Sequence, residues 1–293
     1  MHSIQIGNIT KQYPSSIAEM TSLQFTRFSG LVYKYQTKQI HYDEFMVKLV
    51  YVMLDMQRRV DVNKHPEIDQ ITENINAIAK LNEDFFTTKI EKGKSFKIIK
   101  TDFVKNLLPK IKLGKELYYG PSDALVNTEF GEYVTALNAY IDFSQSGEVS
   151  DLDTLVGTLY RPERKKGKTF RLQNRRIEFD KNSVSYYAEK VSVIPFEEKY
   201  AIYLFFSACQ HFIVTSKELP ISGGITINLS VLFNQNSSTT EKGIGMAGVI
   251  YSLAESNVFG DAEKTAKQNT YDVLLRMIQT YLQAKKLKSN AKN

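Results

Sequence analysis

A helical spacing of apolar residues runs through most of this 293-residue chain and constrains its fold more than any other feature. Between Ser15 and Tyr35, for example, apolar side chains recur every three to four residues, which places them on one face of a helix. The same spacing predicts helices over 41–56, 66–85, 128–143, 151–160, 183–190, 195–214, 243–257 and 261–281. Strands and helices do not alternate along the chain, so the pattern disfavours a doubly wound α/β sheet.

Three segments depart from the helical spacing. Residues 1–14 read as an extended lead-in, and the partial alternation in KSFKIIKTDF predicts a strand within the connection 87–113. Residues 225–233 fit a strand and a helix equally well. We therefore expect a mainly α fold, a multi-helix globular body with a small β-containing connection.

The same pattern suggests three regions along the chain. Residues 1–114 form an N-terminal helical region that ends in the strand-containing connection. Residues 115–221 form a central helical region, and residues 222–293 form a C-terminal helical region. One continuous domain fits the pattern as well.

The longest apolar stretch argues against a membrane protein. AIYLFFSACQHFIV, from Ala201 to Val214, is shorter than the roughly 20 apolar residues that a spanning helix needs, and it contains Gln210 and His211. It predicts a buried helix in which Cys209, the single cysteine, is a small core residue. The opening MHSIQIGN has neither a charged nor an apolar signal region, so we expect a protein that no signal peptide exports.

GIGMAG, residues 243–248, has the Gly-x-Gly-x-x-Gly spacing of a dinucleotide-binding loop. Such a loop follows a strand directly and needs an acidic residue at the end of the next strand. Here a polar stretch precedes Gly243, and SLAESNVFGDAEKT leads into another helix. We expect the glycines to serve close packing, and we expect no cofactor.

No pattern of catalytic or metal-binding residues is recognisable. The four histidines are not paired at ligand spacing, and the chain has no G-x-S-x-G motif. Cys209 lies in an apolar stretch, where a reactive thiolate is disfavoured. We therefore expect a protein that is not an enzyme and has no catalytic residue, cofactor or metal site.

Charge is concentrated in RPERKKGKTFRLQNRR, residues 161–176, which has eight basic residues and one acidic residue. The segment alone has a charge of +7, against +6 for the whole chain, so the rest is close to neutral. It predicts a contact with phosphates or with an acidic protein, with Phe170 available for stacking. A solvated loop is the plain alternative. The candidate contact residues are Arg161, Arg164, Lys165, Lys166, Lys168, Arg171, Arg175 and Arg176.

Several stretches carry a resemblance to a known group of proteins. They are residues 21–54, 113–140, 152–168 and 253–277, and their most telling elements are YGP (119–121), FGEY (130–133) and LYRP (159–162). Together they resemble structural or assembly proteins of tailed bacteriophages and prophages, chiefly of Bacteroidota, encoded among the tail genes near the tape-measure gene. The basic stretch after LYRP is longer and more charged here than in that group.

The resemblance implies a setting and no catalytic step. It implies a virion tail or connector component, or a tail-assembly chaperone, whose partners are other phage tail or connector proteins. It implies that the protein is in the host cytoplasm during assembly. It leaves open whether the protein is then incorporated into the virion. A nucleic-acid-binding protein that uses residues 161–176 is the alternative, and it predicts binding that weakens steeply with salt.

Overall fold

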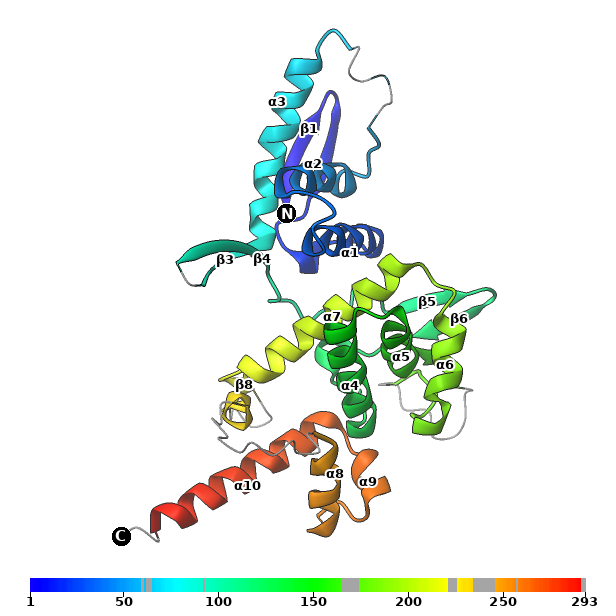
Figure 1. Ribbon diagram of the computed structural model, residues 1–293, viewed down its shortest axis with the longest axis vertical. Helices are drawn as coiled ribbons and strands as arrows, with labels where there is room; N and C mark the ends of the chain where they lie inside the picture. The colour runs from blue at the N-terminus through cyan, green and yellow to red at the C-terminus, as the bar shows by residue number, and fades with distance from the viewer. Residues whose placement is uncertain are drawn as a thin grey trace. The chain divides into compact units, whose positions relative to one another are not determined.

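The computed structural model describes residues 1–58, 61, 65–91, 93–164, 174–220, 226–233, 246–256 and 258–290 (Figure 1). The described chain is mostly helical with small antiparallel sheets, in agreement with the mainly α expectation. It forms two compact units, Met1–Phe103 with Pro195–Phe205, and Val104–Ile194 with Phe206–Asn293. Each unit combines segments that are far apart in the chain. Within the described residues, no helix combines the length and the apolar character that crossing a bilayer requires.

The N-terminal segment of the first unit, Met1–Phe103, has one β-hairpin before and one after its described helices. Its elements are β1 (His2–Ile6), β2 (Ile9–Tyr13), η1 (Ile17–Glu19), α1 (Ser22–Gln36), α2 (Tyr42–Met53), α3 (Ile68–Ala79), η3 (Lys80–Phe85), β3 (Phe86–Glu91) and β4 (Lys94–Ile99). The predicted helix over 15–35 is divided, because Thr21 caps α1. Its hydroxyl accepts from the Gln24 amide (3.2 Å), and the Gln24 side chain accepts from the Thr21 amide (2.8 Å).

Aromatic rings fill the interior of the first unit. The Phe28 ring lies 6.3 Å from that of Phe45 and 5.9 Å from that of Phe85, and all three side chains are fully buried. The first half of α7 (Phe196–Thr215) belongs to this unit and brings Tyr200 against Tyr33, with ring centroids 5.1 Å apart. The unit is therefore held mainly by apolar burial.

The second unit combines a small sheet with several helices. Its elements are β5 (Lys110–Leu113), β6 (Glu116–Tyr119), η4 (Asp123–Leu125), α4 (Phe130–Ser146), α5 (Val149–Leu159), β7 (Arg161–Pro162), η5 (Lys181–Ser183), α6 (Val184–Val191), the rest of α7, β8 (Leu219–Pro220), β9 (Thr226–Ile227), η7 (Leu229–Leu232), α8 (Met246–Glu255), α9 (Ala262–Ala266) and α10 (Thr270–Asn290). The described part of 225–233, which fitted both states, contains a short strand and then a 3-10 turn. The predicted helix over 261–281 is two helices, and the second continues to Asn290.

Helices α4, α5 and α6 pack in series, with α5 between the other two. A Cβ atom at Gly157 would lie 2.5 Å from the backbone nitrogen of Ala188, so glycine allows α5 and α6 to approach this closely. Helix α5 ends at Leu159, and Tyr160 is extended. The ring of Pro162 disfavours helical geometry at the preceding Arg161, which accounts for the end of the helix here.

Candidate functional site

The three short elements YGP, FGEY and LYRP meet in the interior of the second unit. YGP follows β6, FGEY opens α4, and LYRP leads from the end of α5 into β7. The Tyr160 ring covers Gly120, where a Cβ atom would lie 2.5 Å from the ring carbon Cζ. The Tyr160 hydroxyl donates to the carbonyl oxygen of Leu108 (2.6 Å). We call Gly120, Glu132, Tyr160, Arg161 and Arg176 the motif cluster.

One carboxylate and two guanidinium groups form the centre of the motif cluster. Glu132 is fully buried, and Arg161 and Arg176 are each 1% exposed. Arg161 Nη2 lies 3.2 Å from Glu132 Oε2, and Arg176 Nη1 donates to Glu132 Oε1. Glu132 therefore binds two arginines that come from opposite ends of the basic segment.

Other donors of the two arginines reach backbone carbonyls, and Arg176 Nε donates to the side-chain oxygen of Asn174 (3.1 Å). Arg161 Nε donates to Ile177 (3.1 Å), and Arg161 Nη1 donates to Thr158. Arg176 Nη1 donates to Leu159 (2.9 Å). The Arg161 guanidinium also lies 5.6 Å from the centre of the Phe179 ring. Carbonyl oxygens and a ring face thus help to stabilise the excess positive charge.

Burial sets the electrostatics of this site. Loss of solvation lowers the pKa of the Arg176 guanidinium, and the Glu132 carboxylate opposes that shift. Loss of solvation, together with the charge of Glu132, raises the pKa of the Glu129 carboxyl. Buried charges of this kind are costly to separate, so each of the three groups depends on the other two.

The same arginines fix the two ends of the basic segment. The Arg164 amide donates to the Arg175 carbonyl (2.7 Å), and the Ile177 amide donates to the Pro162 carbonyl (3.1 Å). Glu163 and Arg176 form an antiparallel bridge, and β7 continues the sheet beside β6. The described ends of the segment therefore lie side by side and are anchored to the fold.

The structure corrects part of the predicted contact set. Arg161 and Arg176 are buried around Glu132, so their side chains are not available to a phosphate or a partner. Arg164 pairs with Glu178 (2.8 Å), and the guanidinium of the exposed Arg175 lies 5.8 Å from the centre of the Tyr119 ring. The remaining candidates, Lys165, Lys166, Lys168 and Arg171, lie outside the described residues, as does Phe170.

Sequence reasoning missed Glu132. Its signal was available, because this acidic residue stands between the apolar residues Phe130 and Tyr133 at the start of a predicted helix. A carboxylate in such a position stabilises a helix N-terminus. Because that role explains the residue by itself, it gives no indication of a buried ion pair. The Glu132 side chain also accepts from the Glu129 amide (3.4 Å), so it has both roles.

The loop after YGP is held in an unusual conformation. Ala124 and Leu125 have φ of 51° and 60°, in the left-handed region that disfavours residues with a side chain. The Tyr271 hydroxyl donates to the Ala124 carbonyl (2.7 Å), and the Ala124 amide donates to the Val104 carbonyl (2.7 Å). Contacts from two distant segments thus maintain this loop beside the motif cluster.

The other sequence candidates have simpler positions. Helix α8 begins within GIGMAG and includes Gly248, whereas Gly243 and Gly245 lie outside the described residues. Cys209 is fully buried, as predicted, and burial raises the pKa of its thiol. Among the residues with a described position, no group of three or more His, Cys, Asp and Glu side chains is arranged to hold a metal ion.

Comparison with known proteins gives no relative: no protein-family model, no curated protein and no solved structure matches this chain. A functional interpretation therefore has to start from the contacts of the chain itself.

Proposed function

We propose that this chain is a structural or assembly protein of a tailed bacteriophage that acts through protein–protein contacts and not as an enzyme. One observation carries the proposal. The three elements that resemble such proteins, YGP, FGEY and LYRP, supply the interlocking residues Gly120, Glu132, Tyr160 and Arg161. The three short motifs that carry the resemblance therefore contact one another in the fold and are not independent of one another.

The geometry of the motif cluster supports a contact function. Its buried charges are used to hold α4, the end of α5 and both ends of the basic segment together. A segment with anchored ends loses less conformational freedom when it binds than a free chain end does. The basic side chains between Arg164 and Arg175 fit an acidic surface on another tail or connector protein.

The proposal is tested in purified particles from a bacterium whose prophage encodes this chain. Mass spectrometry that finds the chain in stoichiometric amount supports a virion component. Its presence in assembling tails but not in finished particles supports a tail-assembly chaperone. Its absence from both overturns the proposal.

Nucleic-acid binding is the second candidate, and the charge of the basic segment favours it. The variant Lys165→Ser/Lys166→Ser/Lys168→Ser/Arg171→Ser removes four charges and leaves Arg161 and Arg176 in the core. We expect it to abolish a gel shift on DNA at low salt if the segment binds phosphates. The matched control Lys285→Ser/Lys286→Ser/Lys288→Ser removes exposed charge from α10 and should leave the shift in place. A parent protein that gives no shift excludes this candidate.

A further inference from the structure

Helix α3 has an apolar seam that its own unit covers incompletely. Ile68, Ile71, Ile75 and Ile78 are spaced three, four and three residues apart, as in a helix that packs along another helix. Each of these isoleucines is partly exposed, and Ala79 is the buried residue of α3. A stripe of this kind is usually covered when helices pack.

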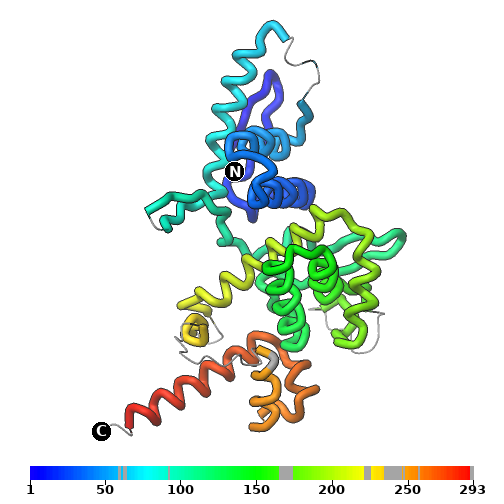
Figure 2. The backbone as a smooth tube through the Cα atoms, in the orientation of Figure 1, coloured from blue at the N-terminus to red at the C-terminus, as the bar shows by residue number. Residues whose placement is uncertain are grey.

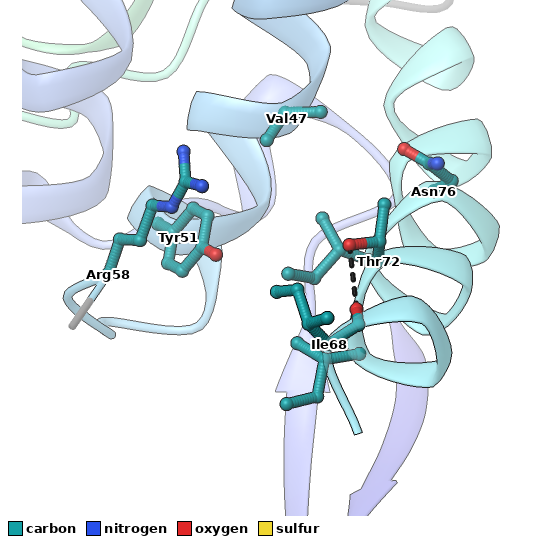
Figure 3. Close-up of a pocket in the computed structure, with 8 residues that line it drawn as sticks. Val47, Tyr51, Arg58, Ile68, Thr72 and Asn76 are labelled. Carbon is teal, nitrogen blue, oxygen red and sulfur yellow. Dashed lines mark hydrogen bonds between the residues drawn. The ribbon is translucent and has the colours of Figure 1, made fainter. Parts of the chain in front are cut away.

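The seam borders an apolar groove between α2 and α3 (Figure 3). Ile68, Ile71 and Ile75 line one side, and Val47 and Tyr51 of α2 line the other. Arg58, Thr72 and Asn76 complete the lining of this α2–α3 groove. The groove has a volume of about 130 Å³. A cavity of about 150 Å³ holds a benzene ring, so the groove can hold one large apolar side chain.

Acidic residues flank the α2–α3 groove. Asp69 and Glu73 are exposed, and each lies three residues before a groove residue, Thr72 or Asn76, so they are its neighbours on the helix surface. On α2, Glu44 is paired with Lys48 (3.0 Å), and Asp43 adds a further negative charge. Arg58 in the lining and Lys48 on α2 are basic, so the four acidic residues outnumber two basic ones, and the groove suits an apolar side chain that has cationic neighbours.

The far end of α10 has this chemistry. The residues from 279 to 290 are exposed except for Tyr281, and this end extends away from the other helices of its unit (Figure 2). It contains Lys285, Lys286 and Lys288 and no acidic residue. Leu282 is 54% exposed and lies one turn before the lysines. At 1.5 Å per residue this end is about 18 Å long, enough to lie along the seam of α3.

We propose that the α2–α3 groove of one copy of this chain binds the exposed end of α10 of a second copy. Leu282 enters the groove, and Lys285 and Lys286 face Asp69 and Glu73. The groove and the helix end are different surfaces, so the contact is head-to-tail. Each assembly therefore keeps one free groove and one free α10 end, to which further copies can bind. This inference goes beyond the proposed function and holds whether or not the chain is a phage protein.

The test is a charge exchange followed by sedimentation velocity of the full chain. We expect a mass that increases with protein concentration and decreases with salt. The variants Asp69→Lys/Glu73→Lys and Lys285→Glu/Lys286→Glu should each weaken association about tenfold or more, because like charges then face each other. An equimolar mixture of the two variants, which pairs the changed surfaces, should associate as tightly as the parent protein.

Controls separate this contact from general effects of charge. Asp142→Lys/Glu189→Lys makes the same change of charge at exposed positions of α4 and α6, which belong neither to the groove nor to the end of α10, and should leave association unchanged. Leu282→Ser should weaken association at every salt concentration. All these side chains are exposed, and circular dichroism checks that each variant is folded. A chain that stays monomeric at all concentrations, or a mixture that does not regain association, overturns the proposal.

Discussion

Phe28 in the first unit and Glu132 in the second are both fully buried, but their neighbours differ in kind. Phe28 lies among aromatic rings that make many weak contacts with one another. Glu132 is bound by two arginines whose own charges have left water. Stabilisation is thus spread over many atoms in the first core and depends on a few polar contacts in the motif cluster.

This difference indicates where the protein tolerates change. A core of similar rings can accept another apolar side chain of comparable size, because neighbours repack around it. A buried cluster of three charges cannot accept the loss of one, because the remaining charges stay buried without compensation. The experiments below test this contrast, from the largest expected effect to the smallest.

Glu132→Gln should have the largest effect. The substitution preserves the shape of the side chain but leaves Arg161 and Arg176 buried without a carboxylate. We expect the free energy of unfolding to fall by about 3–5 kcal/mol, as when one partner of a buried ion pair is removed. Urea denaturation measures the loss, and faster labelling of the buried Cys209 thiol locates it in the second unit. A loss below about 1 kcal/mol would mean that the cluster is not an anchor.

Phe28→Leu should cost less, although Phe28 is buried as deeply as Glu132. Leucine keeps most of the apolar contacts, and we expect a loss of about 1–2 kcal/mol in the same urea measurement. Phe28→Ala is the comparison variant, with an expected loss of about 3–5 kcal/mol because it opens a cavity. If Phe28→Leu proves as damaging as Glu132→Gln, the contrast between the two cores fails.

Glu178→Gln makes the same chemical change as Glu132→Gln at the surface. Glu178 pairs with Arg164 across 2.8 Å, and both side chains are in contact with water. We expect a change of at most about 1 kcal/mol, which is the usual range for an exposed ion pair. The pair of variants measures how much burial adds to the value of a Glu–Arg contact. Equal losses would contradict the assignment of Glu132 to the interior.

Glu19 tests a carboxylate held by hydrogen bonds near the surface. The Ser15 amide (2.8 Å), the N-terminal ammonium of Met1 (3.1 Å) and the Ser15 hydroxyl (2.9 Å) donate to it, and together they lower its pKa from 4.5 to about 2. Because the folded pKa is depressed, the contact stabilises the protein above about pH 4.5, and this stabilisation is lost as the pH falls through about 2. Titration of the Glu19 carboxyl by NMR gives the pKa directly. Ser15→Ala removes the hydroxyl and should move the pKa of Glu19 upward. An unchanged pKa would exclude the hydroxyl as a cause of the shift.

Local sequence patterns predicted most helices of the described chain, with errors where a cap or a break intervened. Apolar spacing located α2, α5 and α7 to within a few residues. It missed the division at Thr21, where a side chain competes for backbone hydrogen bonds. It also merged α9, which Asp261 caps, with α10. Local patterns could not indicate that each compact unit is assembled from segments far apart in the chain.

The basic segment separates what the sequence determined from what the fold decided. The sequence alone established that charge is concentrated between Arg161 and Arg176, because this is a local property. Only the tertiary structure decided that the first and last arginines turn inward. Their partner, Glu132, is 29 residues before one and 44 before the other, and no local pattern specifies a contact over that distance. Burial depends on which helices pack together. Arginines of one segment therefore differ, and Arg161 and Arg176 are buried whereas Arg175 is exposed.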